Sequence, residues 1–374
     1  MQPAKLYYSE PYTRSFKALV RSCTKKDDIY EIQLDKTPFY PEGGGQPSDT
    51  GQIGCSSITH VYEKNGTITH IGDKPLNTGE IYDANIHWPR RFDHMQHHSA
   101  EHLVSGIIHK RYGADNVGFN IGEQYVTIDF NTELDKKAIE NIEFLANEAI
   151  FKNLPIKVEY FDNTPPFSYR SKKELVGIIR IVTIDDYDVC ACAGTQLKST
   201  GEIGIVKIIS CVKYKSGSRL YMLCGHRALK DYRLKEDNIS AIGSLLSAKP
   251  YEVSDYVHKL FEEKESLKFD LLRAKYELID IKSKEILPAD NILLFEADLT
   301  QEEMKRYYEN LAEKAPLIAI FSGCDSQSYR YMVSADTIDV KDLNTKLNGK
   351  GGGKGTAFGQ VTASKIKIEK YFNK

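Results

Sequence analysis

The chain has 374 residues, of which 41% are hydrophobic and 27% are charged, a composition typical of a globular protein with two to four domains. Its formal net charge of −2 excludes a uniformly basic surface, so a nucleic acid would have to bind a local patch. Seven cysteines at scattered spacings and no leading secretory signal predict a cytoplasmic protein with reduced thiols. No apolar run approaches the ~20 residues that a membrane span needs, so we expect no contact with a membrane.

Residues 1–90 have the pattern of a β-rich domain, which we predict to be a β-barrel. Short alternating runs are interrupted by turn-forming segments such as PEGGGQPSDTG and KPLNTG. The dipeptide Asn65-Gly66 lies between two such runs, and it favours a type I′ hairpin because both central residues of that turn have positive φ. We therefore expect a hairpin at this point.

Residues 91–227 are predicted to form an α+β domain. Helical spacing of apolar residues indicates a first helix that begins near Asp93, as its cap, and ends before Gly113. A second helix is expected from about Asp135 to Asn153, and the segment IKVEYF then begins a series of strands. The domain thus combines two helices with several strands.

A histidine pair and a distant cysteine form a candidate zinc site in this domain. His98 and His102 are four residues apart, so their imidazoles lie on the same face of a helix. Cys192 follows ninety residues after His102, in a segment rich in glycine and threonine that is typical of a loop. Two imidazoles and one thiolate can bind a tetrahedral cation and leave one position for substrate or water.

Residues 228–286 are predicted to form a helical stalk. Nine positions from 253 to 281 alternate in steps of four and three, and all but Lys264 are apolar. Such a seam favours a coiled coil or a helical hairpin. We expect a homodimer through this stalk, and the alternative is a helix that packs on its own domain.

Residues 287–374 are predicted to form a small α/β domain. The glycine run in GKGGGKG brings backbone N–H groups within reach of a phosphate, and Lys350 and Lys354 flank it. Eight lysines lie from Lys341 to Lys374, against two acidic residues. This basic patch is a candidate for contacts with nucleic-acid phosphates, whereas a flexible loop and a solvated tail are the alternatives.

The order of the motifs resembles one known family. TPFYPEGGGQPSDTG, HMQHHSAEH, CACAGTQ, STGEIG, CGHRAL and GKGGGKG follow one another along the chain. This succession is similar to the alanyl-tRNA editing proteins of the AlaX group, in the long form that carries a C-terminal domain like that of alanyl-tRNA synthetase. The resemblance covers nearly the whole chain and is strongest over about residues 35–227.

The resemblance implies a zinc site with one departure from the family pattern. In the family, a histidine pair and a later Cys-x3-His bind zinc, and His98, His102 and Cys192 match three of these ligands. Gln196 stands at the position of the fourth ligand, and its neutral amide oxygen is a poorer partner for zinc than imidazole. Three outcomes stay open: three protein ligands with water in the fourth position, a substitute ligand such as Cys190, or weak metal binding with lost activity.

The resemblance also implies roles for residues around the metal. Gln46 is the candidate for orienting a water or the ester carbonyl, because its amide can both donate and accept hydrogen bonds. Gly44 and Gly45 allow close backbone approach to a substrate. Other residues would contact the substrate or the acceptor-stem phosphates: Thr37 a serine hydroxyl, Thr195 the wall of the substrate pocket, and Arg90 and Arg91 the phosphates.

The function that the resemblance implies is hydrolysis of a mischarged tRNA in trans. We expect a zinc-dependent aminoacyl-tRNA hydrolase that removes serine, or glycine, from tRNA for alanine. No synthetase activity is expected, because no adenylate-forming domain precedes the β-rich part. One alternative is a catalytically weak or inactive tRNA-binding paralogue. Another is a zinc hydrolase for peptides or small esters, but the chain lacks the glutamate after the first histidine that HExxH proteases use.

Overall fold

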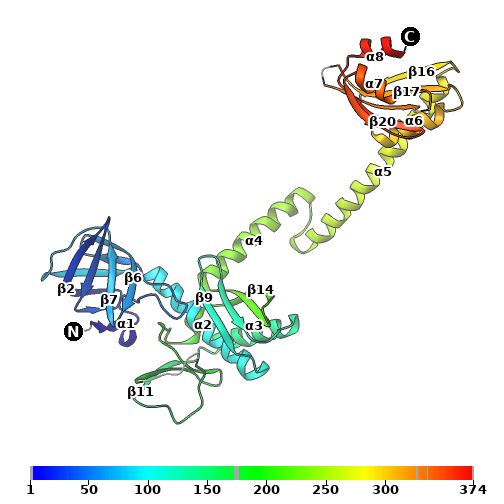
Figure 1. Ribbon diagram of the computed structural model, residues 1–374. Coiled ribbons are helices and arrows are strands. Elements are labelled where there is room, and N and C mark those ends of the chain that lie inside the picture. The colour runs from blue at the N-terminus through cyan, green and yellow to red at the C-terminus, as the bar shows by residue number, and fades with distance from the viewer. Residues whose placement is uncertain (1–2, 172–176, 326, 335, 373–374) are drawn as a thin grey trace. The chain divides into compact units, whose positions relative to one another are not determined.

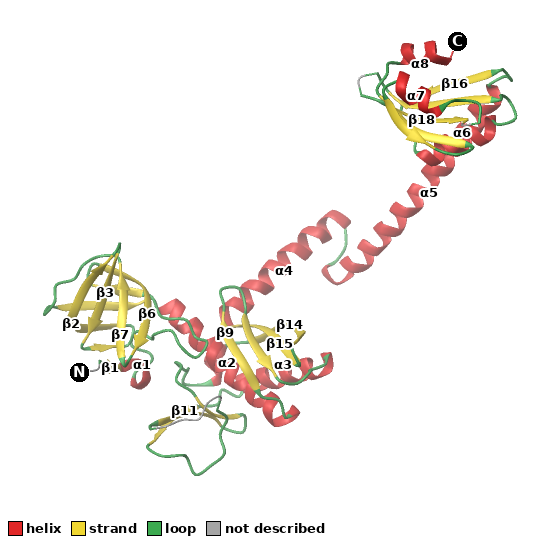
Figure 2. Cartoon of the chain, in the orientation of Figure 1, coloured by secondary structure: helices red, strands yellow, loops and turns green. Residues whose placement is uncertain are grey.

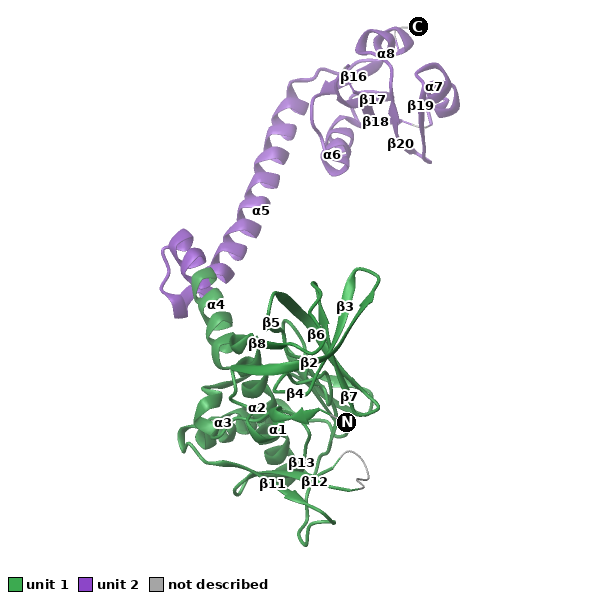
Figure 3. Cartoon of the chain, turned by 90° about the vertical axis from the view of Figure 1, so that its left-hand side faces the viewer, with its two compact units in different colours: residues 1–238 green, residues 239–374 purple. Residues whose placement is uncertain are grey.

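The computed structural model describes residues 3–171, 177–325, 327–334 and 336–372. The chain divides into two compact units, residues 1–238 and residues 239–374 (Figure 3). The sequence predicted four segments. The predicted β-rich and α+β segments share the first unit, and the predicted stalk crosses the boundary between the units. Among the described residues, no helix is both long and apolar enough to cross a membrane.

The first unit begins with a closed β-barrel, as predicted (blue in Figure 1). A short parallel pair, β1 (Ala4–Lys5) and β4 (Lys36–Thr37), and the single-turn helix α1 (Leu6–Ser9) accompany the barrel. Both residues of the predicted hairpin, Asn65 and Gly66, have positive φ, at 52° and 79°, so the hairpin is confirmed. The barrel strands, in order around the barrel, are β2 (Ser15–Lys26), β3 (Ile29–Leu34), β7 (Thr67–Gly72), β6 (Ser56–Lys64), β5 (Gly51–Ile53) and β8 (Ile81–Ile86).

Helix α2 (Trp88–Tyr112) follows the barrel directly and carries the histidine pair. It starts at Trp88 rather than near Asp93, because Pro89 occupies its first turn, where the fixed φ of proline suits a helix start. Asp93 is therefore not a cap, and its carboxylate pairs with Arg227 instead. The helix ends as predicted at Gly113, whose φ of 63° is left-handed.

Helices α2 and α3 (Lys136–Phe151) pack against an antiparallel sheet of four strands (Figure 2). Asp135 caps α3 by accepting a hydrogen bond from Ala138 N, as expected for this helix start. A continuous apolar core lies among these elements. The strands, in sheet order, are β14 (Val206–Tyr214), β15 (Gly217–Cys224), β10 (Val126–Phe130) and β9 (Asn116–Ile121).

A separate sheet of three strands places the candidate cysteine next to α2. Strand β11 (Ile156–Phe161), β12 (Ile179–Ile184) and β13 (Asp188–Ala191) pair antiparallel in sequence order. Cys192 follows β13 directly, and the loop after it leads to the short helix η1 (Thr200–Ile203). The IKVEYF segment is thus a strand, and Cys192 lies on connecting backbone, both as predicted.

The predicted stalk consists of two helices. Helix α4 (Gly225–Leu246) runs from the first unit into the second, and α5 (Val253–Glu285) follows the short helix η2 (Pro250–Glu252). Of the nine seam positions, Val253 alone is buried. The helical character is confirmed, and the coiled coil stays a prediction.

The second unit contains a mixed sheet with helices on both faces. Strands β16 and β17 are parallel and are connected by α6, whereas the other neighbours are antiparallel. Part of the glycine run is not a loop: Gly349–Gly352 forms the edge strand β19, because its backbone pairs with β20. The elements are β16 (Asn291–Glu296), α6 (Gln301–Leu311), β17 (Leu317–Gly323), β18 (Tyr329–Ser334), α7 (Val340–Lys346), β19, β20 (Thr356–Val361) and α8 (Lys365–Phe372), with sheet order β16-β17-β18-β20-β19.

Candidate metal centre

The two histidines of α2 and Cys192 converge as the sequence predicts. One ligand atom from each of His98, His102 and Cys192 lies within 4.8 Å of the others. The Cys192 Sγ is 3.3 Å from His98 Nε2, and the two imidazole rings are stacked with their centroids 5.5 Å apart. Both histidines are buried, whereas Cys192 is partly exposed.

The orientation of His102 leaves one ring nitrogen available. Its Nδ1 is 2.8 Å from Asp188 Oδ2, and its buried Nε2 has no hydrogen-bond partner among the described residues. Burial alone would raise the pKa of Asp188, but hydrogen bonds from His102 and Arg170 outweigh burial and lower it. The ionised carboxylate therefore holds the proton on Nδ1, an arrangement common behind metal-bound histidines. Burial alone would lower the pKa of His102, but the charge of Cys192 and the hydrogen bond to Asp188 raise it well above its usual value, so a metal at Nε2 would displace a proton.

Gln46 orients His98 in a comparable way. Its Oε1 is 2.8 Å from His98 Nδ1 and accepts a hydrogen bond from Thr195 N at 3.2 Å. Its Nε2 donates to Thr195 Oγ1 at 2.8 Å. Gln46 and Thr195 are thus hydrogen-bonded to each other behind His98. Their contact with His98 Nδ1 directs His98 Nε2 toward Cys192. The predicted contacts of Gln46 with water or an ester carbonyl, and of Thr195 with substrate, stay predictions.

The environment of Cys192 favours the thiolate. Burial alone would raise the pKa of the thiol, but the charges of His98 and His102 outweigh burial and hold that pKa well below its usual value. The backbone N–H of Gly194 also donates to Sγ at 3.3 Å. A thiolate is the form of cysteine that binds metals.

Gln196 does not have the orientation of a metal ligand. Its Oε1 accepts a hydrogen bond from Ser99 Oγ at 2.7 Å, and its Nε2 faces Cys192 Sγ at 3.7 Å. The amide oxygen, the only group of glutamine that can bind zinc, is turned toward Ser99, and a ligand role for Gln196 stays a prediction. Gln196 instead supports the sulfur with an N–H group.

The glycine loop before Gln46 packs against β9. Gly45 has a φ of 82°, and a Cβ on it would lie 2.3 Å from Phe119 O, so its backbone lies close to Phe119, and its predicted contact with a substrate stays a prediction. The Phe119 ring in turn lies 5.1 Å from the His98 ring. Gly44 has a φ of 59° and open space around it, and its predicted contact with substrate stays a prediction.

Thr37 is fully buried in the barrel. Its hydroxyl lies 2.9 Å from His70 Nε2 and accepts a hydrogen bond from Phe39 N at 3.1 Å. These contacts give Thr37 a structural role within the barrel. The predicted contact with a serine side chain stays a prediction, and it would have to compete with the bond to His70.

The two arginines before the histidine pair differ in their surroundings. Arg91 is fully buried and forms an ion pair with Asp49, so its predicted contact with tRNA phosphates stays a prediction and would have to compete with that pair. Arg90 is partly exposed and donates one hydrogen bond to Ser48 O at 3.2 Å. Arg90 therefore remains a candidate for contact with RNA.

Lys350 and Lys354 of the second unit are exposed. Lys350 lies on the edge strand β19, and Lys354 lies in the turn between β19 and β20. No ion pair joins either lysine to a carboxylate of the described residues. Both are placed as a phosphate contact would require, and their role stays a prediction. Lys374, the last lysine of the predicted patch, lies outside the described residues.

Several residues of the site were not predicted. Asp188 contacts His102, Arg170 donates to Asp188, and Ser99 donates to Gln196. Gly194 allows the His98 ring to approach, since a Cβ on it would lie 2.0 Å from His98 Cε1. One signal was available: Asp188, Cys190 and Cys192 alternate in DVCAC, and alternate residues of a strand share a face. The other contacts cannot be recognised from the spacing of residues along the sequence.

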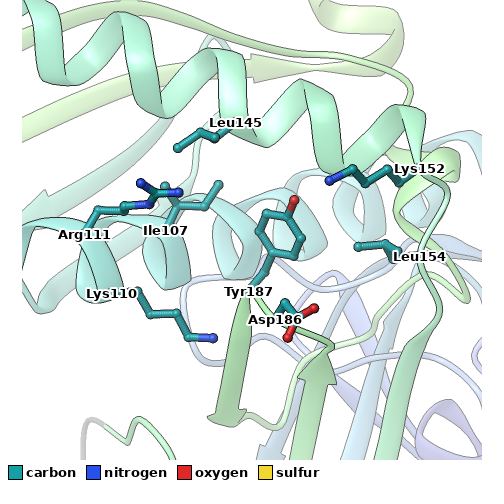
Figure 4. Close-up of a pocket in the computed structure, with 8 residues that line it drawn as sticks. All are labelled: Ile107, Lys110, Arg111, Leu145, Lys152, Leu154, Asp186 and Tyr187. Atoms are coloured by element: carbon teal, nitrogen blue, oxygen red, sulfur yellow. The ribbon is translucent and has the colours of Figure 1, made fainter.

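A basic hollow lies between the C-terminal ends of α2 and α3, away from the cluster residues. Figure 4 shows the Tyr187 ring at its centre, with Lys110, Arg111 and Lys152 around it. The cavity has a volume of about 290 Å³. Cations at helix C-termini are stabilised by the helix macrodipole, which accounts for these three charges without a ligand.

Comparisons with known proteins agree with the geometry. Residues 179–227, which include Asp188, Cys192 and Gln196, match the family described as the threonyl and alanyl tRNA synthetase second additional domain. The chain is 37% identical over 237 residues to alanyl-tRNA editing protein AlaX-L of Pyrococcus horikoshii, which covers 60% of this chain and 59% of that protein. The predicted resemblance to the alanyl-tRNA editing proteins is confirmed.

Further relatives extend the similarity over the rest of the chain. Alanyl-tRNA editing protein Aarsd1-A of Xenopus laevis is 30% identical over 276 residues, which cover 71% of this chain and 66% of that protein. The alanine–tRNA ligase of Ignicoccus hospitalis is 29% identical over 387 residues, which cover 99% of this chain and 42% of the ligase. The chain therefore spans about three fifths of the AlaX-L protein and less than half of the ligase.

Proposed function

We propose that this protein is a zinc-dependent aminoacyl-tRNA hydrolase that removes serine, or glycine, from mischarged tRNA for alanine in trans. The observation that carries the proposal is the convergence of three ligand atoms within 4.8 Å, in a chain whose residues 179–227 match the synthetase additional domain. The names of two relatives, which are alanyl-tRNA editing proteins, support the substrate class. All seven cysteines are free thiols, which suits the reducing cytoplasm.

The residues of the cluster fit zinc. Two imidazoles and a thiolate are ligands that zinc prefers, and the buried His102 Nε2 lacks any partner among the described residues. His98, His102 and Cys192 would hold the ion and leave one position open, which is typical of catalytic sites. Zinc bound there would lower the pKa of a water or hold a substrate oxygen.

The chain's own groups would supply most of the positioning. An aminoacyl ester is already activated, so hydrolysis needs mainly a placed water and a held 3′-terminal ribose. Asp188 and Gln46 keep the two imidazoles in single orientations. The N–H groups of Gly194 and Gln196 direct hydrogen atoms at the Cys192 sulfur, which favours the thiolate form that binds a metal.

The fourth ligand position has two candidates. Cys190 belongs to a second group, with His102 and Asp188, whose ligand atoms also lie within 4.8 Å of one another. Water in the open position would leave one thiolate on the metal, whereas Cys190 would add a second. The absorption spectrum of the cobalt-substituted protein counts the thiolates, and we expect one.

The second unit would supply tRNA contacts and pairing. Lys350 and Lys354 are exposed near the sheet edge, where they can contact phosphates. Seam residues of α5 such as Leu267 and Leu271 are 68% and 59% exposed, and a second copy of α5 would cover them. We therefore include a homodimer through α5 in the proposal. Deletion of residues 287–374 should raise the KM for tRNA more than it lowers kcat.

A catalytically silent tRNA-binding protein is the second candidate. It is favoured by Gln196, which stands at the fourth ligand position of the family and turns its oxygen away from the cluster. The two candidates predict the same RNA contacts, so turnover alone separates them.

The test is deacylation by the full chain with its zinc content measured by elemental analysis. We expect hydrolysis of tRNA for alanine that carries serine or glycine, and sparing of the same tRNA that carries alanine. A chelator should abolish turnover, and added zinc should restore it. Binding of the mischarged tRNA without turnover, by protein that contains one zinc ion per chain, would favour the silent candidate.

A further inference from the structure

A second cavity lies at the N-terminal end of α2. It has a volume of about 630 Å³, which is within the range of small-ligand pockets. None of the three cluster residues lines it. Its lining includes two aromatic rings, three groups that can carry positive charge and a buried histidine, namely Trp88, Phe92, Arg90, His226, Arg227 and His94.

The aromatic wall of this cavity is partly open to solvent. Trp88 and Phe92 are partly exposed, and their ring centroids are 5.6 Å apart. Arg14 lies over the Trp88 ring at 4.4 Å from its centroid. Aromatic faces beside arginines are the surfaces on which unpaired nucleic-acid bases stack.

The cations of the cavity are only partly neutralised. Arg227 pairs with Asp93 at 2.9 Å. No ion pair joins Arg90 or His226 to a carboxylate within the described part of the chain. Arg90 therefore brings uncompensated charge to the cavity, as contact with a phosphate group requires.

His94 lines the cavity and has an unsatisfied polar atom. The residue is 1% exposed, and its Nδ1 has no hydrogen-bond partner among the described residues. Burial, followed by the charges of Arg90 and Arg227, lowers the pKa of His94 to about 3. The ring is therefore neutral at physiological pH, and a buried atom of this kind usually has a partner, which a ligand would provide.

The cavity lies close to the metal cluster along α2. His94, His98 and His102 are spaced by four residues, so they share one helix face. The helical rise puts His94 and His98 about 6 Å apart along the axis. A strand of RNA whose last nucleotide reaches the cluster could therefore place an adjacent nucleotide in this cavity.

We propose that the cavity binds an unpaired nucleotide of the 3′ strand of tRNA, adjacent to the one that carries the amino acid. Its base would stack on Trp88, its edge would bond to His94 Nδ1, and its phosphate would contact Arg90. The substrate named here rests on the proposed function. The binding site itself is additional, since it contains none of the metal-ligand candidates.

Trp88 allows a direct test because it is the single tryptophan of the chain. The full chain is titrated with an RNA hairpin that ends in the unpaired tRNA 3′ sequence, and the emission of Trp88 is recorded. We expect saturable quenching by this RNA and weaker binding, by about tenfold, for the same hairpin with a blunt end. Arg90→Gln should raise the Kd for the overhang RNA about tenfold, which corresponds to about 1.4 kcal/mol.

Lys110→Gln is the matched control, because it removes one exposed positive charge from the same helix outside this cavity. It should change the Kd by less than about twofold, as expected for one screened surface charge. Unchanged Trp88 emission, with binding of labelled RNA shown by anisotropy, would overturn the inference. Equal effects of Arg90→Gln and Lys110→Gln would overturn it as well.

Deacylation by the same samples separates this inference from the proposed function. Turnover of mischarged tRNA without quenching of Trp88 would reject the nucleotide site and leave the hydrolase. Quenching by the overhang RNA without turnover would reject the hydrolase and leave the site. If Arg90→Gln failed to fold, the titration of the unmodified chain with the two hairpins would still decide.

Discussion

Helices α2 and α5 are both long, but their surroundings are opposite. Sixteen of the 25 residues of α2 are buried, whereas three of the 33 residues of α5 are buried. The buried positions of α2 include Arg91, His98 and His102, and the exposed positions of α5 include a row of leucines. Side-chain polarity alone therefore does not decide which helix is enclosed.

The difference lies in where each helix finds its partners. Distant segments of the first unit supply partners for the polar residues of α2: Asp49 for Arg91 and Asp188 for His102. Buried polar groups are tolerated only when they are paired in this way. For the apolar seam of α5, no element of the described residues encloses most of its side chains, so a second chain is the partner that we propose.

The largest effect is expected from the buried ion pair of α2. Arg91→Met leaves the Asp49 carboxylate buried without its partner, which should lower the free energy of unfolding by about 3–5 kcal/mol. Urea denaturation measures the loss. Arg111→Met, on the exposed end of the same helix, should change stability by less than about 0.5 kcal/mol. Similar losses for both variants would mean that burial of α2 does not depend on this pair.

Removal of the sulfur ligand should have the next largest effect, on metal binding rather than stability. Cys192→Ala deletes one of three convergent ligand atoms. Zinc affinity should therefore fall by more than ~100-fold, the largest loss usual for residues that contact a ligand but not the metal. Elemental analysis after dialysis measures the retained zinc. Cys55→Ala, which removes an exposed thiol of the barrel, is the control. Full retention of zinc by Cys192→Ala would remove this cysteine from the site.

A smaller effect on zinc affinity is expected from Asp188, which contacts the ligand candidate His102. Asp188→Asn keeps the shape of the side chain but weakens its hold on the His102 Nδ1 proton, so zinc affinity should fall about 10–100-fold. Competition with a chromophoric chelator measures the change. Asp186→Asn is the control, since Asp186 is exposed two residues away. Equal affinities for both variants would show that Asp188 does not orient His102.

The smallest effect on the folded chain is expected on α5. Leu267 is 68% exposed, so Leu267→Glu should change the stability of the isolated chain by less than about 0.5 kcal/mol. The same change should dissociate a dimer that buries the seam, and sedimentation velocity would detect it. Ser266→Glu adds the same charge off the seam and should leave the dimer intact. If the unmodified protein sediments as a monomer at all concentrations, the proposed pairing is rejected.

The sequence was sufficient where the information is local. The hairpin at Asn65-Gly66, the end of α2 at Gly113 and the cap of α3 at Asp135 depend on the backbone preferences of those residues. The spacing of His98 and His102 also placed two ligand atoms on one helix face. The succession of the family motifs along the sequence then indicated Cys192 as the partner of the two histidines.

Only the tertiary structure decided what the remaining polar groups contact. Gln196 stands at the family's fourth ligand position, but Ser99 of α2 donates a hydrogen bond to its oxygen. Arg91 was a candidate for contact with RNA, but it is buried in an ion pair with Asp49. Each outcome depends on a hydrogen-bond partner from a distant segment. The position of a side chain in the sequence does not identify that partner, because many polar groups could occupy the same buried space and only the folded structure shows which one does.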